Sequence, residues 1–205
     1  MKLEAPPQRR IGLTGGIATG KSTVAQLLSE RFGLPVLDAD LYAHQALASG
    51  TPGAQAVLER YGDAVRNRST IDLDRPALGR IVFADAAERR WLEGLVHPLV
   101  RQRFAAELQR LAAAPVVVLM IPLLYEAGLE ELCTEIWLVD CPEAEQLRRL
   151  MARDGLGEAE ARARLAAQWP QQRKRALADV VIDNEDGQKS LADRLARAFS
   201  PSASR

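Results

Sequence analysis

The residues best suited to chemistry form one stretch near the N-terminus, Gly15-Gly16-Ile17-Ala18-Thr19-Gly20-Lys21-Ser22. It matches G-x-x-x-x-G-K-[ST], the pattern of a phosphate-binding loop. Its glycines let the backbone turn tightly and aim successive N–H groups at phosphate oxygens. We expect Lys21 to reach the β- and γ-phosphates of a nucleoside triphosphate and the Ser22 hydroxyl to bind Mg²⁺. A chance glycine-rich turn is disfavoured, because the stretch lies between a predicted strand and a predicted helix.

Two carboxylates, in Asp38-Ala39-Asp40, follow the second predicted strand. Open α/β sheets bind their ligands at the carboxyl edge of the strands. In a strand-like D-x-D both side chains point the same way, so both are expected to face the γ-phosphate. One could accept the proton of an attacking hydroxyl while the other orders a Mg²⁺-bound water. Alternatively, Asp40 caps a helix that begins at Leu41.

Two arginines, Arg149 and Arg153, are spaced i, i+4 on a helix predicted to begin at Pro142, with Gln146 near them. Such a pair could close over a triphosphate as a lid and neutralise transition-state charge. Periodicity alone favours the alternative, an ordinary solvated face on a helix rich in Glu and Arg.

The histidines and the last strand offer weaker candidates. His44 and His97 are too few for a metal site. The pair His97-Pro98 is interpreted as a helix boundary or a substrate contact. Asn184 ends the last predicted strand, where it could meet an adenine edge or serve as a turn residue.

The elements that must position these residues follow a strand–loop–helix–strand pattern, which predicts an α/β fold with a central parallel sheet flanked by helices. The stretch after Asp40 is rich in Ala, Leu, Arg and Glu and contains no segment typical of a buried strand. The predicted strands are 11–14, 34–37, 116–121, 136–139 and 180–182, and the predicted helices begin at 21, 142, 158 and 191. The expected domains are a nucleotide-binding core of 1–40, 115–145 and 175–205, a helical acceptor-binding insertion of 41–114 and a lid of 146–174.

Composition excludes several classes of protein. The 205 residues include 27 basic and 27 acidic side chains, a balance that argues against a general nucleic-acid binder. Cys133 and Cys141 form no CxxC pair and are expected to be reduced, mostly buried thiols. Residues 1–10 lack the apolar segment of a signal peptide, and the apolar run 116–124 is too short to span a bilayer. We therefore expect a soluble, cytoplasmic protein with no membrane or nucleic-acid partner.

The sequence resembles the dephospho-CoA kinase family over roughly residues 11–191. The resemblance begins with the phosphate loop and Asp38-Ala39-Asp40, and its most specific segments are His97-Pro98-Leu99-Val100 and Pro122-Leu123-Leu124-Tyr125-Glu126. It continues through Leu73-Asp74-Arg75, Phe83, Gln146, Arg149, Arg153, Gln168 and Val180-Val181-Ile182-Asp183-Asn184.

The resemblance implies transfer of the γ-phosphate of ATP to the ribose 3′-hydroxyl of dephospho-CoA, with Mg²⁺ as cofactor. By position, Asp40 resembles the general base and Asp38 its neighbour on the Mg²⁺ side. The implied catalytic residues are Lys21, Asp40 and Arg149, and the implied metal ligands are Ser22 and Asp38. The implied nucleotide contacts are Gly15, Gly16, Ile17, Ala18, Thr19, Gly20, Lys21, Ser22, Thr23, Arg149, Arg153 and Asn184, and the implied acceptor contacts are Asp38, Asp40, Arg75, Phe83 and His97. A monomer or weak homo-oligomer is expected.

Three positions depart from the family pattern: Ala18 where glycine is common, Met120 where many members carry Asp, and His44 where Arg is frequent. Ala18 must therefore adopt a backbone conformation often given to glycine. Two alternatives remain at this stage, a nucleoside- or shikimate-type small-molecule kinase and a P-loop nucleotide switch. The switch is disfavoured because Asn184 is followed by Glu185 and not by the N-K-x-D sequence that specifies guanine.

Overall fold

The structure, a computed structural model, describes residues 7–67, 70–185 and 188–199. Its contacts divide the chain into two compact units, which we call the sheet unit (residues 1–38 and 111–205) and the helical unit (residues 39–110). The segment 146–174, which we expect to act as a lid, belongs to the sheet unit in this division.

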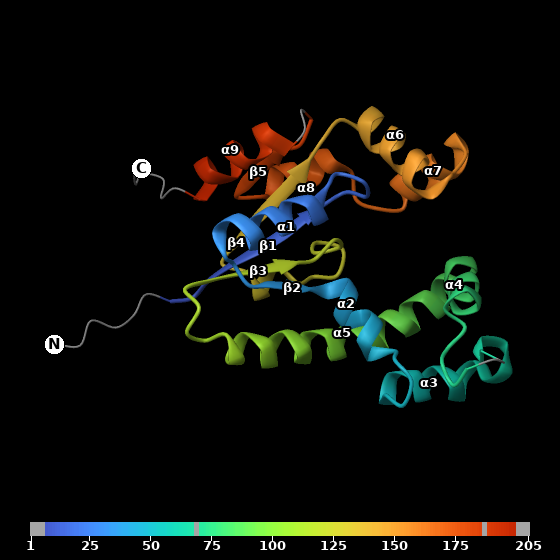
Figure 1. Ribbon diagram of the computed structural model, residues 1–205. Helices are drawn as coiled ribbons and strands as arrows, with labels where there is room; N and C mark the ends of the chain where they lie inside the picture. Colours follow the sequence, from blue (N-terminus) through green and yellow to red (C-terminus); the bar gives the residue numbers. More distant parts are fainter. Residues whose placement is uncertain (1–6, 68–69, 186–187, 200–205) are drawn as a thin grey trace. The chain divides into compact units, whose positions relative to one another are not determined.

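A five-stranded parallel sheet forms the centre of the sheet unit (Figure 1). Its strands lie in the order β2-β3-β1-β4-β5, and every described pairing between neighbours is parallel. The bounds are β1 Arg9–Gly15, β2 Val36–Asp38, β3 Val116–Met120, β4 Glu135–Asp140 and β5 Val180–Asp183. This confirms the predicted fold class and all five predicted strands, to within a few residues at their ends.

Helices flank this sheet and complete its core. The α-helices of the sheet unit are α1 Lys21–Phe32, α6 Glu143–Asp154, α7 Glu158–Ala166, α8 Gln171–Leu177 and α9 Gln188–Phe199, and a 3₁₀ turn, η2, spans Glu130–Leu132. Leu28 of α1 and Leu195 of α9 pack in one buried cluster with Ile11, Trp137 and Ile182 of the strands. Gly33 ends α1 in the left-handed conformation, as expected of a C-cap glycine.

Apart from one isolated antiparallel β-bridge between Arg66 and Leu73, the described residues of the helical unit form helices and turns, as expected for the insertion. Its helices are α2 Ala39–Ala46, α3 Pro52–Tyr61, η1 Gly62–Val65, α4 Arg75–Ala84 and α5 Ala86–Arg110. Tyr42 of α2 and Phe104 of α5 meet edge to face with ring centroids 5.2 Å apart, and Val100 is buried beside them on α5. Edge-to-face aromatic pairs of this kind contribute about 0.5–1.5 kcal/mol beyond their buried area.

Three local predictions were wrong. Pro98 is no helix boundary, because it lies inside the 25-residue helix α5. The short helix α8 was not predicted at all. The D-x-D segment is strand-like only up to Asp38, since α2 begins at Ala39, so the two carboxylates do not share a strand face. Asp40 therefore lies within the first turn of α2 rather than capping a helix from Leu41, and a carboxylate there is favoured by the helix dipole.

Both cysteines are free thiols that the fold shields. Burial raises the pKa of Cys133 to about 12 and that of Cys141 to about 11. Thiolates are the reactive form, so neither residue is suited to nucleophilic chemistry near neutral pH. Among the described residues, no helix has the length and apolarity needed to cross a membrane.

Candidate active site

The phosphate loop joins β1 to α1 at the carboxyl edge of the sheet. Three of its residues have positive φ, namely Gly15 (152°), Ala18 (61°) and Gly20 (95°). Ala18 is the one non-glycine residue with positive φ in the described part of the chain, which confirms the conformation expected at this departure from the family pattern. The Thr19 hydroxyl donates to the carbonyl of Gly16 (2.9 Å) and closes the turn from inside.

The loop carries its cation at the N-terminus of α1. The Nζ atom of Lys21 donates to the carbonyls of Gly15 (2.8 Å) and Gly16 (2.7 Å), which holds the ammonium against the loop. Lys21 opens α1, and Ser22 follows it with an exposed side chain. The positive end of a helix dipole and a lysine therefore face the same place, an arrangement suited to phosphate.

Asn184 supports this loop from the end of β5. Its side chain donates from Nδ2 to the carbonyl of Thr19 (2.7 Å), and its backbone N–H donates to the carbonyl of Asp140 (2.7 Å). The residue is only 7% exposed, and a Cβ atom at Gly20 would collide with its Nδ2. The structure thus places Asn184 beneath the loop; its predicted contact with adenine stays a prediction.

The two arginines of α6 differ in their surroundings. Arg149 donates from Nη2 to the carbonyl of Asn184 (3.0 Å), and its Nη1 lies 3.5 Å from the carbonyl of Thr19. Arg153 instead forms an ion pair with the adjacent Asp154 (2.7 Å), and 58% of its side chain is exposed. The structure brings only Arg149 to the phosphate loop.

Glu145 orients Arg149 from one turn earlier on α6. Its Oε1 lies 2.6 Å from the Nε of Arg149, and the same carboxylate accepts hydrogen bonds from Arg148. These two guanidiniums, Arg148 first and Arg149 second, lower the pKa of Glu145 to about 2. The carboxylate is therefore ionised throughout the physiological range.

Three glutamines surround the first half of the loop. The Oε1 of Gln168 accepts a hydrogen bond from the backbone N–H of Ile17 (2.9 Å). A Cβ atom at Gly16 would lie 2.8 Å from Oε1 of Gln146 and 3.0 Å from Oε1 of Gln171, so a side chain there would displace these two amides. The family resemblance included Gln168 but gave it no role, and Gln171 was not predicted, because an isolated glutamine carries no local signal.

Asp38 ends β2 at the same edge of the sheet. In the parallel register it is level with Met120 of β3, which is level with Leu13 of β1. One strand therefore separates β2 from β1, which puts the Cα atoms of Asp38 and Leu13 about 10 Å apart across the sheet.

The oxygen donors at this edge fit a magnesium ion. The Ser22 hydroxyl and the Asp38 carboxylate are hard oxygen ligands, and Mg²⁺ usually takes one or two protein ligands and completes its shell with water and substrate phosphate. Among the described residues, no cluster of three or more His, Cys, Asp or Glu side chains is placed to hold a metal ion.

In the helical unit, Asp40 lies on α2, and the other predicted acceptor contacts lie apart along α4 and α5. Arg75, at the start of α4, donates to the carbonyls of His44 (2.9 Å) and Leu47 (3.2 Å). Phe83, near the end of α4, is 82% exposed, and His97 is half-buried within α5.

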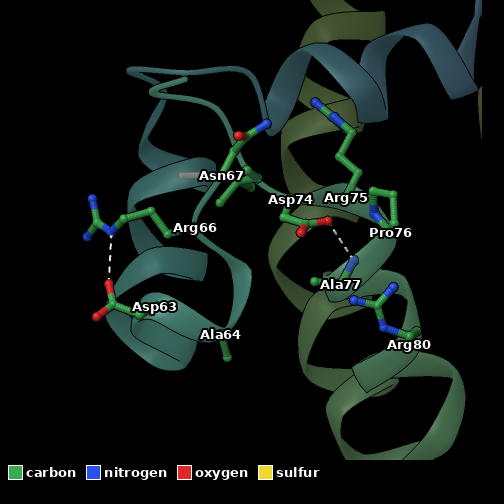
Figure 2. A pocket seen from close by; sticks show the side chains of 10 residues that line it. Asp63, Ala64, Arg66, Asn67, Asp74, Arg75, Pro76, Ala77 and Arg80 are labelled. Atoms are coloured by element: carbon green, nitrogen blue, oxygen red, sulfur yellow. Dashed lines mark hydrogen bonds and ion pairs between the residues drawn. The ribbon is translucent and has the colours of Figure 1, made fainter. Parts of the chain in front are cut away.

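Arg75 also lines a polar pocket of about 770 Å³ within this unit (Figure 2). Figure 2 shows Asp63 and Arg66 paired on the η1 side and Arg80 on α4. The Asp74 side chain caps α4 by accepting a hydrogen bond from the N–H of Ala77 (2.9 Å). The pocket therefore presents three guanidiniums and two carboxylates, Asp63 and Asp74, and this excess of positive charge favours an anionic ligand.

The comparisons with known proteins agree with this geometry. A "Dephospho-CoA kinase" of Synechococcus sp. (strain CC9605) is 62% identical over 178 residues, which cover 87% of this chain and 86% of the relative. A "Dephospho-CoA kinase" of Parasynechococcus marenigrum (strain WH8102) is 60% identical over 190 residues, covering 93% of this chain and 94% of the relative.

Solved structures share the fold. The crystal structure of TT1252 from Thermus thermophilus superposes with a TM-score of 0.82 at 41% identity and covers 94% of this chain and 96% of that one. A dephospho-CoA kinase from Campylobacter jejuni superposes with a TM-score of 0.69 at 26% identity, covering 92% of this chain and 94% of that one. The family model described as dephospho-CoA kinase matches residues 9–190, and the chain belongs to that family.

Proposed function

We propose that the protein transfers the γ-phosphate of ATP to the ribose 3′-hydroxyl of dephospho-CoA, which yields coenzyme A and ADP in the last step of coenzyme A synthesis. The observation that carries this proposal is the combination of family membership with a phosphate loop that has its cation, Lys21, in place. Phosphoryl transfer needs little covalent chemistry from the protein, and its catalysis is mainly positioning and electrostatic stabilisation.

The sheet unit supplies the nucleotide side of this reaction. The loop N–H groups and the start of α1 would bind the phosphates, and Lys21 would exchange its two carbonyl contacts for phosphate oxygens. Arg149 would neutralise charge that develops on the transferred group, since it already reaches the loop at Thr19. Thr23 and Arg153 remain predicted contacts of the nucleotide.

Ser22 and Asp38 would hold Mg²⁺, which when bound offsets the negative charge of the phosphates. Asp40 would accept the proton of the ribose hydroxyl. General-base assistance of this kind contributes about 10²–10⁴-fold to the rate. The arginine-lined pocket and Arg75, Phe83 and His97 would serve the acceptor, whose diphosphate is an anion.

A coupled assay of ADP release tests this function. We expect turnover with dephospho-CoA at least a hundredfold faster than with adenosine, AMP or shikimate. Preferential turnover of shikimate or adenosine would instead favour the rival small-molecule kinases, and acceptor-independent ADP release would favour a nucleotide switch. We further propose a cytoplasmic monomer or weak homo-oligomer without a nucleic-acid partner, which the equal numbers of acidic and basic residues support.

A further inference from the structure

The segment Gln168–Arg175 binds the sheet unit at several points although its first three residues are not helical. It leaves α7, passes through Trp169 and Pro170 and continues as α8. Its contacts reach the phosphate loop, the loop after β3 and the ends of β4 and β5. We call these eight residues the anchor segment.

The anchor segment meets the phosphate loop at its third residue. The Oε1 of Gln168 accepts the N–H of Ile17 at 2.9 Å, across 151 residues of sequence. Thr19 closes the loop from within through Gly16, whereas Gln168 holds it from outside. A backbone amide that is held in this way fixes the direction of its peptide plane, and the peptide planes of this loop decide where its other N–H groups point.

A buried contact with Glu126 fixes the start of the anchor segment. The Oε1 of Glu126 accepts the N–H of Trp169 (3.0 Å) and lies 2.7 Å from Nζ of Lys174, in an ion pair whose angles fall outside those of a hydrogen bond. Lys174 is completely buried, and the ring of Trp169 is parallel to that of Tyr125 with centroids 6.2 Å apart. Tyr125 and Glu126 thus hold the backbone directly beside Gln168.

The rest of the anchor segment is fixed to the carboxyl edge of the sheet. Gln171 donates from Nε2 to Oδ1 of Asp140 (2.9 Å), and Arg175 pairs with Asp140 (2.7 Å) and Asp183 (3.1 Å). These two carboxylates, Asp140 first, raise the pKa of Arg175. The residues that directly follow Gln168 are therefore bound to the sheet unit's own strands and loops.

We propose that Gln168 is a positioning residue for the phosphate loop: by holding the Ile17 amide it keeps the loop in the form that binds the nucleotide's phosphates. The proposal deepens the kinase function proposed above and rests on it. Gln168 acts through Ile17 and needs no contact with the nucleotide itself. Because it lies just after α7, it also links the predicted lid to the loop that receives the phosphates.

The test compares Gln168→Met with Gln172→Met. Methionine keeps the length of the side chain but lacks the amide acceptor, and Gln172 is an exposed residue of α8. Calorimetric titration with ADP should give a dissociation constant about 3-fold to 10-fold higher for Gln168→Met, the worth of one neutral hydrogen bond. Gln172→Met should bind ADP as the wild type does, and both variants should keep the KM for dephospho-CoA.

Hydrogen exchange of the Ile17 amide provides the second measurement. Without nucleotide, this amide should exchange faster in Gln168→Met than in the wild type or in Gln172→Met. Equal ADP affinity in the two variants would overturn the proposal. A lower unfolding temperature of Gln168→Met with unchanged exchange of the Ile17 amide would also overturn it, because Gln168 would then be needed only for folding. Wild-type protein that makes no coenzyme A would overturn the proposed function instead, and the ADP titration would still be interpretable.

Discussion

The phosphate loop and the helical unit differ in how their functional residues are held. The loop is held by side chains distant in the sequence, Gln168 and Asn184, and these contacts act on its backbone. In the helical unit Arg75 is bound to nearby helix carbonyls, and Phe83 projects into solvent with 82% of its surface exposed. If the proposed roles hold, the fold preorganises the nucleotide side, whereas Phe83 on the acceptor side is exposed and available for a contact. Variants of the two regions should therefore change different kinetic constants.

Asp40→Asn should have the largest effect. Loss of the proposed base predicts a kcat lower by about 10²–10⁴-fold, with the KM for ATP within a few-fold of the wild-type value. Removing the charge from the first turn of α2 should cost only about 0.3–1 kcal/mol of stability. Steady-state kinetics and thermal unfolding check both statements. Wild-type kcat would refute the base, and a folded variant that no longer binds Mg·ATP would assign Asp40 to the metal.

Lys21→Ala tests the nucleotide side. Removing a cation that stabilises the transferred phosphoryl group should lower kcat by about 10²–10³-fold. The fold should persist, because Lys21 is only partly buried at the start of α1. Circular dichroism and the ADP-release assay measure the two properties, and near-normal kcat in a folded variant would contradict the assignment of the loop.

Arg149→Ala and Arg153→Ala sharpen the comparison on a single helix. Arg149 reaches Asn184 and the loop, so its loss should lower kcat by about 10-fold to 100-fold, the worth of a charged hydrogen bond. Arg153 pairs with its exposed neighbour Asp154 and should change kcat by less than about 2-fold, as for other exposed ion pairs. Equal losses would indicate that both arginines close over the nucleotide as a lid.

Gly20→Ala should weaken nucleotide binding through the backbone. An alanine at φ 95° is strained by about 1–3 kcal/mol, and its Cβ would displace the Asn184 amide, so ADP affinity should fall about 5-fold or more. The KM for dephospho-CoA should remain at the wild-type value. Gly50→Ala is a suitable control for strain alone, because that glycine also has positive φ (79°) but open space at the Cβ position.

Ala18→Gly should have the smallest effect, in the opposite direction. Glycine relieves the backbone strain of a left-handed residue at φ 61°, which stabilises the folded state. It also raises the entropy of the unfolded chain, which offsets part of this gain. The free energy of unfolding should therefore rise by about 1 kcal/mol or less. Thermal unfolding measures it. Destabilisation by this substitution would show that the alanine methyl makes a packing contact worth more than the strain.

The sequence predicted what local patterns encode. The five strands were recognisable from short apolar runs, and the phosphate loop from a motif whose residues are contiguous. The family resemblance included Gln168 without giving it a role, and no pattern indicated Gln171 or Lys174. Each acts through a partner more than 30 residues away, and a single glutamine or lysine in a polar helix is more often a solvated side chain.

The wrong predictions have physical causes. Helix α8 has seven residues, six of them polar or small, so it has no apolar stripe that would predict it; its contacts are those of buried Lys174 and of Arg175, which forms ion pairs. Pro98 removes one backbone hydrogen bond of α5. The helix nevertheless continues through it, because Val96 before the proline and Val100 and Phe104 after it are buried. Tertiary packing overrides the local preference in both places.

The most direct test of the central claim is identification of the product by phosphorus NMR and mass spectrometry after incubation with ATP, Mg²⁺ and dephospho-CoA. We predict one coenzyme A per ADP, with a single new phosphomonoester on the ribose 3′ oxygen, and no product from a dephospho-CoA analogue that lacks the 3′-hydroxyl. ADP formed without a phosphorylated acceptor, or a phosphate on any other oxygen, would contradict the account.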